Sequence, residues 1–434
     1  MARLNECILY RNFEHGEILD KMAELMNAWE KKAPDLKEKE GLFFECANGL
    51  VETAGAYGFS GNLWHCYLTF LLVNNENAFS TACEIRGAVN GSINELALND
   101  FGVFKELYDF DLTVLDEAFG ISCCKVLGDY TNTGSNSKMF NSRIRDRICD
   151  LSKTLAAAES TEEFMKDMVQ FYKDFGVGKL GLHKAFRVGH DENDNVEIQP
   201  ITRIAHVKLE DLVGYEIPKQ KLIENTEAFV RGRKANNCLL FGDAGTGKSS
   251  SIKGILNRYY DEGLRIIEVY KHQFQDLNDV IAQIKNRNYK FIIYMDDLSF
   301  EEFEIEYKYL KAVIEGGLEK KPDNILIYAT SNRRHLVREK FSDKEERRDD
   351  LHSSDTVQEK LSLVARFGVS IFFCAPDKKQ FQNIVKTLAE RHQVEMPEEE
   401  LLLEANKWEL QHGGLSGRTA QQFIDYLCGK NENE

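Results

Sequence analysis

The sequence has few prolines and no apolar segment long enough to cross a membrane. Only six prolines occur among 434 residues, and none lies between Pro34 and Pro200. Because proline interrupts helices, this long proline-free region favours them. The most apolar run, residues 63–73, is shorter than the roughly 20 residues that a membrane-spanning helix needs, and it contains His65. We therefore expect a buried helix there and no membrane partner.

The sequence also lacks any C-x-x-C pair among its ten cysteines. Adjacent residues such as Cys123 and Cys124 rarely form a strain-free disulfide, and the other spacings match no zinc site. The N-terminus has no charged-then-apolar pattern of a secretory signal. These absences predict reduced cysteines in the cores, no structural metal and a cytoplasmic location.

Positive charge is in deficit. The formal net charge is −16, because 71 acidic residues outnumber 55 basic ones. An acidic chain is a poor default partner for nucleic acid, although a local basic patch is compatible with this balance. We therefore regard nucleic acid as an unfavoured partner.

The first 183 residues are predicted to form an all-helical domain of unknown role. Residues 17–29 carry apolar side chains at helical spacing. Ser160 and Glu163 form a capping-box pattern that opens a second amphipathic segment, and Gly176 ends it. This region contains no recognisable catalytic constellation.

After residue 183 the pattern changes from helical to alternating. Two short alternating segments within residues 184–204 predict a hairpin or linker. Residues 205–375 then alternate apolar runs with helical segments, which predicts an α/β domain with a five-stranded, mostly parallel sheet and flanking helices. Residues 376–434, which begin at Pro376, are predicted to form a small helical domain. The five predicted strands are residues 238–241, 266–269, 291–295, 325–329 and 369–373.

The most specific motif is a phosphate-binding loop. It fits G-x-x-x-x-G-K-[ST], follows an apolar strand and precedes a helix, which is the context that this pattern requires. Its glycines allow backbone N–H groups to surround phosphate oxygens, Lys248 can reach the outer phosphates, and Ser249 can ligate Mg²⁺. The predicted nucleotide-binding residues here are Gly242, Asp243, Ala244, Gly245, Thr246, Gly247, Lys248, Ser249 and Ser250.

Three polar residues follow the next strands of the predicted sheet. Asp296 and Asp297 end one strand, and Asn332 ends the next. In an open α/β sheet, this edge lies beside the phosphate loop. We expect Asp296 to support Mg²⁺, Asp297 to orient the attacking water and Asn332 to sense the γ-phosphate. The alternative is that the aspartates cap a helix and Asn332 forms a turn.

Two arginines are further candidates, although each is also compatible with an ordinary surface position. Arg366 precedes the last predicted strand and follows a predicted helix that starts near Thr356. Arg418 opens a helix in the C-terminal segment. The chemistry of phosphoryl transfer needs such positive charge near the γ-phosphate.

Taken together, these segments resemble the AAA+ ATPases. Residues 242–249 match Walker A, Asp296 and Asp297 stand at Walker B, residues 329–333 resemble the sensor-1 strand end, and residues 416–418 resemble sensor 2. A closer similarity is to the bacterial predicted-ATPase family catalogued as domain of unknown function 815. That similarity rests on residues 295–301, 314–319, 328–336 and 413–420.

The resemblance implies ATP, Mg²⁺ and a homo-oligomer that acts on an unknown protein client. It implies that Val213 and Gly214 lie on the adenine side, that Arg418 closes the lid, and that Arg366 reaches a neighbouring subunit's nucleotide. Arg333 and Arg334 are alternatives for this last role.

The Asp-Asp pair departs from the commoner Asp-Glu of AAA+ proteins, so we expect slow turnover. It also leaves two alternatives to an ATPase: a nucleotide-gated scaffold with little hydrolysis, or a nucleic-acid protein similar to helicase loaders.

Overall fold

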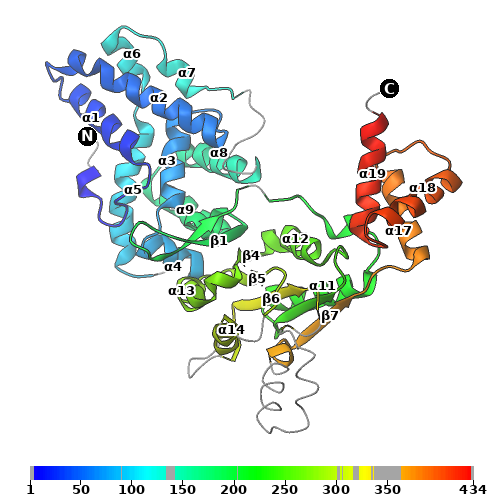
Figure 1. The fold of residues 1–434 in the computed structure, drawn as a ribbon. Coiled ribbons are helices and arrows are strands. Elements are labelled where there is room, and N and C mark those ends of the chain that lie inside the picture. Colours follow the sequence, from blue (N-terminus) through cyan, green and yellow to red (C-terminus); the bar gives the residue numbers. More distant parts are fainter. Residues whose placement is uncertain are drawn as a thin grey trace. The chain divides into compact units, whose positions relative to one another are not determined.

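The computed structural model describes residues 4–88, 90–132, 142–202, 204–300, 304, 306–315, 322–333, 336 and 363–431. The predicted helix near Thr356 lies outside these residues. The chain divides into two compact units, Met1–His183 and Lys184–Glu434 (Figure 1). Each unit is described on its own. None of the helices in the described residues is long and apolar enough to cross a membrane.

The described part of unit 1 is helical, as the sequence predicts. Ser160 begins α9 by accepting a hydrogen bond from the backbone N–H of Glu163 at 3.2 Å, and Gly176 follows the last turn. Its elements are η1 (Leu4–Glu6), α1 (Glu17–Glu30), η2 (Leu36–Lys39), α2 (Glu40–Tyr57), α3 (Leu63–Asn74), α4 (Ala78–Arg86), α5 (Ile93–Asp109), α6 (Thr113–Phe119), α7 (Cys124–Gly128), α8 (Ser142–Ala157), α9 (Thr161–Phe175) and α10 (Gly178–Leu182).

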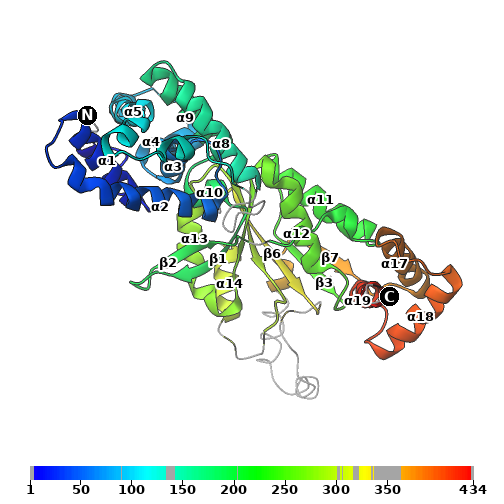
Figure 2. The ribbon, with the colours of Figure 1, turned by 90° about the horizontal axis from the view of Figure 1, so that it is seen from above.

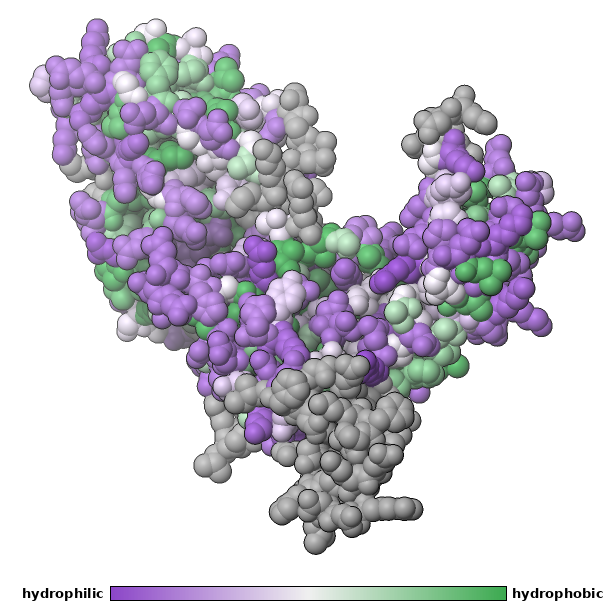
Figure 3. All heavy atoms as spheres, viewed as in Figure 1, coloured by the Kyte–Doolittle hydropathy of each residue, from purple (hydrophilic) through white to green (hydrophobic). Residues whose placement is uncertain are grey.

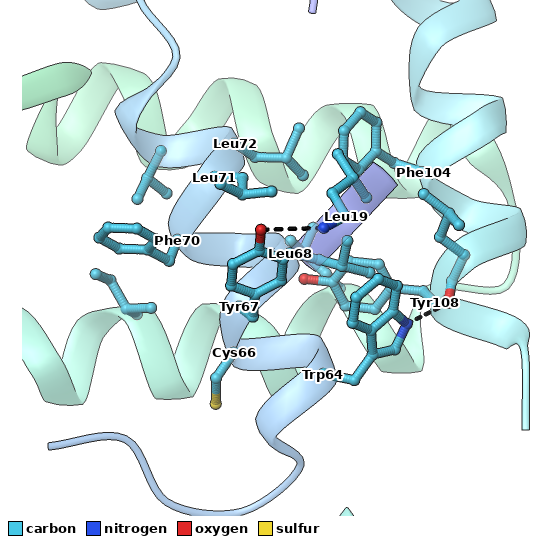
Figure 4. Packing of buried hydrophobic residues seen from close by; sticks show 14 of the residues in the cluster. Leu19, Trp64, Cys66, Tyr67, Leu68, Phe70, Leu71, Leu72, Phe104 and Tyr108 are labelled. Atoms are coloured by element: carbon cyan, nitrogen blue, oxygen red, sulfur yellow. Dashed lines mark hydrogen bonds between the residues drawn. The ribbon is translucent and has the colours of Figure 1, made fainter. Parts of the chain in front are cut away.

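Helix α3 is the centre of unit 1. It is buried on almost every side, as expected for a helix without a polar face. Figure 4 shows its aromatic and aliphatic side chains among those of neighbouring helices. The polar atoms of its large aromatic residues are paired: Trp64 donates to the Leu107 carbonyl at 2.9 Å, and the Tyr67 hydroxyl accepts from the Leu19 N–H at 3.2 Å.

A buried carboxylate fixes the N-terminal stretch to α5. Asp100 is fully buried and accepts backbone N–H groups from Ile8, Leu9 and Tyr10 at 2.7–3.0 Å. These bonds satisfy a charge that would otherwise be costly to bury. No periodicity in the sequence indicates this contact, because its partners are some 90 residues apart.

Unit 2 is an α/β fold with a mostly parallel sheet, which confirms the predicted fold class. All five predicted strands are present, and the predicted hairpin adds two more at one edge, so the sheet has seven strands in the described residues. Its elements are β1 (Ala185–His190), β2 (Val196–Pro200), η3 (Leu209–Asp211), α11 (Glu216–Val230), β3 (Cys238–Gly242), α12 (Lys248–Tyr259), η4 (Tyr260–Glu262), β4 (Leu264–Glu268), η5 (Lys271–Asp276), α13 (Leu277–Ile284), β5 (Lys290–Met295), α14 (Glu306–Glu315), β6 (Ile325–Ser331) and β7 (Val369–Phe373).

The strand order is β2-β1-β4-β5-β6-β3-β7. The β1–β2 pair is antiparallel, and every other pair is parallel. Consequently the carboxyl ends of β5, β6 and β3 lie side by side. The chain segments that follow these three strands are the ones in which the sequence predicts the nucleotide site.

Helices cover both faces of the sheet. The apolar sides of α11 and α12 pack on one face, in a cluster that includes Leu222, Ile255 and Leu240. Figures 1 and 2 show α13 and α14 on the other side of the sheet from α12. Burial on both faces explains why these strands appear as continuous apolar runs instead of alternating ones.

The C-terminal helices of unit 2 have a separate core. They are α17 (Lys378–Arg391), α18 (Glu398–Gln411) and α19 (Gly417–Asn431), and they pack around Phe381, Leu401 and Phe423. Asp377 caps α17 by accepting from the backbone N–H of Gln380 at 2.8 Å. We call these three helices the lid.

The surface of the protein on the side seen in Figure 3 is mainly hydrophilic, and hydrophobic side chains form patches between the hydrophilic ones.

Candidate functional site

The predicted phosphate loop joins β3 to α12, in the strand–loop–helix arrangement that the motif requires. Gly242 has a φ of 137°, and a Cβ atom there would lie 2.0 Å from the Phe373 carbonyl oxygen. Gly245 has a φ of 74°, and a Cβ atom there would press on the lid near Ser416. These two positions therefore require glycine for different reasons: close packing between β3 and β7, and close approach of the lid.

Lys248 lies buried at the start of α12, with 7% of its surface exposed. Its ammonium donates to the carbonyls of Gly242 and Asp243 at 2.8 and 2.6 Å and to Asn332 Oδ1 at 3.1 Å. Burial lowers the pKa of this ammonium, against the opposing effect of the carboxylates of Asp243, Asp297 and Asp296. The lysine is thus held at the mouth of the loop by three oxygen acceptors.

Asp296 is fixed by three hydroxyl groups from three elements. Ser249 of α12, Tyr294 of β5 and Thr330 of β6 donate to its Oδ1 at 2.8, 2.7 and 2.6 Å. Burial by itself would raise the pKa of Asp296, but these hydrogen bonds outweigh it and hold the pKa below its ordinary value. The carboxylate is therefore ionised and oriented. All three hydrogen bonds end on Oδ1, and none of them involves Oδ2.

Asp297 and Asn332 are directly connected. The Asn332 amide donates to Asp297 Oδ1 at 2.7 Å, while its own carbonyl oxygen accepts from Lys248. The backbone N–H of Asp297 donates to Thr330 Oγ1 at 2.9 Å. Asp297 has a φ of 49°, in the left-handed region that non-glycine residues seldom adopt. Strained backbone of this kind is enriched at functional sites.

The lid contacts the phosphate loop through the start of α19. The backbone N–H of Arg418 donates to the Gly245 carbonyl at 3.2 Å. Arg391 of α17 donates to the carbonyls of Asp211 and Glu210 at 2.8 and 2.9 Å, on the segment that precedes α11. Both ends of the lid are thus tied to the loops that surround the site.

A cavity of about 760 Å³ lies between these parts. A pocket of this volume is within the usual range for ligands of small-molecule size. The predicted site residues that line it are Val213, Ala244, Gly245, Thr246, Gly247, Lys248, Ser249, Ser250, Asp296, Asp297, Asn332 and Arg418.

Several predicted residues are outside this lining. Gly242 and Asp243 contribute carbonyl acceptors for Lys248 instead. Gly214, with a φ of 83°, lies beside Ile384 of the lid. Arg366 forms an ion pair with Glu315 at the end of α14. Arg333 is exposed, and Arg334 lies outside the described residues.

Sequence reasoning missed several residues of the site. Tyr294 and Thr330 carry the hydroxyls that orient Asp296, and both are buried. Their signal was a polar group near the end of an otherwise apolar strand. Tyr215 and Lys219 also line the cavity, and Lys219 donates to the Leu212 carbonyl at 2.6 Å. No pattern in the sequence distinguished Tyr215, which precedes α11, or Lys219, which lies within it, from their neighbours.

The oxygen donors here fit Mg²⁺. Magnesium prefers hard oxygen ligands and usually retains several waters, so one hydroxyl and one carboxylate are a sufficient protein contribution beside phosphate. Ser249 and Asp296 supply that pair. Among the described residues there is no group of three or more His, Cys, Asp or Glu residues that could hold a metal ion by themselves.

Comparison with solved structures found the Holliday junction branch migration motor RuvB of Thermotoga maritima. The two chains share 14% sequence identity. The match covers 50% of this chain and 71% of the RuvB chain, with a TM-score of 0.32. A mutant of the same protein gives 15% identity over the same shares, with a TM-score of 0.33. A comparison with curated proteins found no match.

The sequence model of one protein family matches residues 182–431, more than half of the chain, and therefore nearly all of unit 2. The family is described as "Protein of unknown function (DUF815)". This match confirms the predicted resemblance, and the chain belongs to the DUF815 family.

Proposed function

We propose that this protein binds ATP with Mg²⁺ in the cavity of unit 2 and hydrolyses it slowly. The observation that carries the proposal is the connection from Lys248 through Asn332 to Asp297, beside an ionised Asp296. It links a phosphate-binding cation, a γ-phosphate sensor and a carboxylate that can orient water. Phosphoryl transfer needs these groups together.

Each group has a distinct task. Lys248 neutralises phosphate charge, and the glycine-rich loop presents its backbone N–H groups at the positive end of α12. Ser249 and Asp296 hold Mg²⁺, which, when bound, withdraws charge from the phosphate oxygens. Asp297 accepts a hydrogen bond from the attacking water, and Asn332 fixes the direction of that carboxylate. Arg418 adds positive charge from the lid side.

Turnover is proposed to be slow because Asp297 has a shorter side chain than glutamate. A carboxylate that reaches less far holds the water less well in line with the scissile bond. A second proposal follows from the same residue: a scaffold that binds ATP and scarcely hydrolyses it. Its support is that Asp297 is already engaged by Asn332.

The proposed biological output is nucleotide-dependent assembly of several copies, or remodelling of a protein client, in the cytoplasm. Arg366 is proposed to act on the nucleotide of an adjacent copy. Its support is the position of Arg366 just before β7, outside the cavity of its own chain.

The test is steady-state phosphate release from ATP over a range of protein concentrations, in parallel with ATP binding. Lys248→Ala removes the phosphate contact, and Lys253→Ala is the matched control because Lys253 is an exposed lysine on the same helix. We expect release that rises faster than protein concentration, that is lost in Lys248→Ala and that persists in Lys253→Ala. Binding without release would favour the scaffold, and absence of binding would refute both proposals.

A further inference from the structure

Two cysteines of unit 1 lie opposite each other on packed helices. Cys66 belongs to α3 and Cys149 to α8, and the two helices pack directly together. Their sulfur atoms are 4.0 Å apart. In Figure 4 the Cys66 sulfur points away from the aromatic side chains that surround Tyr67. Neither cysteine takes part in a disulfide.

The surroundings of the pair are polar, which is unusual next to an apolar helix. Cys66 Sγ lies 3.6 Å from the Ser60 carbonyl and 3.5 Å from Ser152 Oγ. Ser152 in turn donates to the Cys149 carbonyl at 2.7 Å. These contacts orient the Cys66 sulfur, so this thiol does more than fill space in an apolar core.

The two thiols differ in exposure and in acidity. Cys66 is 1% exposed, whereas Cys149 is only partly buried. The hydrogen bond from Cys66 is the main cause that lowers the pKa of Cys149, to about 7, and the Arg145 charge adds to it against burial and Asp146. The same hydrogen bond raises the pKa of Cys66. The hydrogen bond therefore makes Cys149 the more acidic thiol of the pair, and the more acidic thiol is the better candidate for oxidation.

We propose that Cys66 and Cys149 are a redox modification site, at which a hydroperoxide converts the thiol pair into a disulfide between α3 and α8. Cys149 is the residue that reacts with the oxidant, and Cys66 is the resolving residue. All residues of this site belong to unit 1, whereas the nucleotide cavity belongs to unit 2.

The proposed reaction balances in two steps. The Cys149 thiolate attacks the hydroperoxide, the O–O bond breaks, and Cys149 becomes a sulfenic acid while the other oxygen leaves as an alcohol or water with a proton from solvent. The Cys66 sulfur then attacks the Cys149 sulfur and displaces hydroxide, which takes the Cys66 proton and leaves as water. Two thiols have lost two electrons, and one hydroperoxide has gained them.

The remaining cysteines provide internal comparisons. Cys123 and Cys124 are adjacent in sequence, which disfavours a disulfide between them, and burial raises the pKa of Cys124. Cys374 is exposed and reports whether the oxidant has reached the protein. A reaction confined to Cys66 and Cys149 would therefore reflect their geometry and not the general presence of thiols.

The test uses the reduced full-length chain under native conditions. It is treated with hydrogen peroxide, its free thiols are alkylated at acidic pH, and its peptides are mapped by mass spectrometry without reduction. We expect a peptide pair that links Cys66 to Cys149, reversed by dithiothreitol. Because the new bond closes a loop of many residues, the melting temperature of unit 1 should rise by several degrees.

Variants separate the two roles. Cys149→Ser should abolish oxidation of Cys66, and Cys66→Ser should leave a sulfenic acid on Cys149 that a dimedone reagent traps. Cys123→Ser is the matched control and should leave the linked peptide unchanged. Should Cys66→Ser fold poorly, the wild-type map and Cys149→Ser decide the matter. The proposal is overturned if Cys374 is oxidised while the pair stays reduced, if Cys149 proceeds to sulfinic acid without a link, or if the link forms only in denaturant.

Discussion

The side-chain amide of Asn332 donates to Asp297 Oδ1 at 2.7 Å, so the residue predicted to sense the γ-phosphate also holds the carboxylate predicted to orient water. The two residues end adjacent strands, β6 and β5. A nucleotide whose γ-phosphate forms a hydrogen bond with Asn332 would therefore also alter the hydrogen bond that orients Asp297. A substitution at Asn332 should therefore impair hydrolysis more than it impairs ATP binding.

Replacing Asn332 with alanine removes one oriented donor and one acceptor of Lys248, which retains the carbonyls of Gly242 and Asp243 as acceptors. We expect the turnover number to fall by about 10²–10³-fold, the usual effect of losing one preorganised donor, with little change in ATP affinity. Single-turnover hydrolysis and equilibrium binding separate the two quantities. Asn383→Ala, an exposed asparagine on α17, is the control. Equal losses in binding and turnover would argue against a sensing role.

Replacing Arg366 with alanine tests the proposed action between copies. A finger arginine contributes about 10³–10⁵-fold to hydrolysis, so a loss of that order is expected. Glu315→Gln is the informative companion, because it removes the carboxylate partner of Arg366 and retains the arginine. Mixing Arg366→Ala with Lys248→Ala should restore part of the activity at shared interfaces. Unchanged hydrolysis in Arg366→Ala would show that the residue is only a partner of Glu315.

Thr330→Val keeps the volume of a buried side chain and removes its hydroxyl. That hydroxyl donates to Asp296 and accepts from the Asp297 N–H, so one buried donor loses its partner. We expect a loss of about 1–3 kcal/mol in the free energy of unfolding of unit 2, measured with urea. Thr387→Val on α17 is the control, since its hydroxyl only bonds to a carbonyl within its own helix. Identical midpoints for wild type and Thr330→Val would contradict the orienting role of this hydroxyl.

The lowered pKa of Asp296 predicts how stability depends on pH. A carboxyl whose folded pKa lies below its unfolded value contributes stability above the unfolded pKa, and this contribution is lost as the pH falls through the folded pKa. The stability difference between wild type and Asp296→Asn should therefore be constant above about pH 5 and change only below about pH 4. Urea titrations at each pH measure it. A difference that already changes near neutral pH would mean that burial dominates and the pKa is raised.

Gly242→Ala should strongly destabilise unit 2. The new methyl group would lie 2.0 Å from the Phe373 carbonyl, so β3 and β7 must separate. Overpacking of this kind costs about 1–3 kcal/mol, and more where backbone has to move. Gly429→Ala in α19 meets no neighbouring atom within 4 Å and should be neutral or stabilising by up to about 1 kcal/mol. Circular dichroism melts compare the two, and equal melting temperatures would refute the expected clash.

The sequence was informative wherever a local pattern determines a local structure. The apolar runs predicted the five parallel strands β3 to β7, and the loop motif placed Lys248 and Ser249 at the start of α12. It was uninformative wherever distant residues meet. Tyr294 and Thr330 are ordinary strand residues until the parallel pairing of β5 with β6 brings their hydroxyls to one carboxylate. The same holds for Asp100 and its backbone partners, and for Cys66 and Cys149.

The three hydroxyls on Asp296 Oδ1 have a consequence for quality control during folding. They come from α12, β5 and β6, so the carboxylate proposed to support Mg²⁺ is oriented only when these elements are assembled in the correct register. A slip of one residue in β6 would place Ala329 or Ser331 where Thr330 stands and would reverse which side chains face the cavity. On the proposed function, binding of a nucleotide would thus depend on the correct pairing of β5 with β6 and would report that unit 2 has folded correctly.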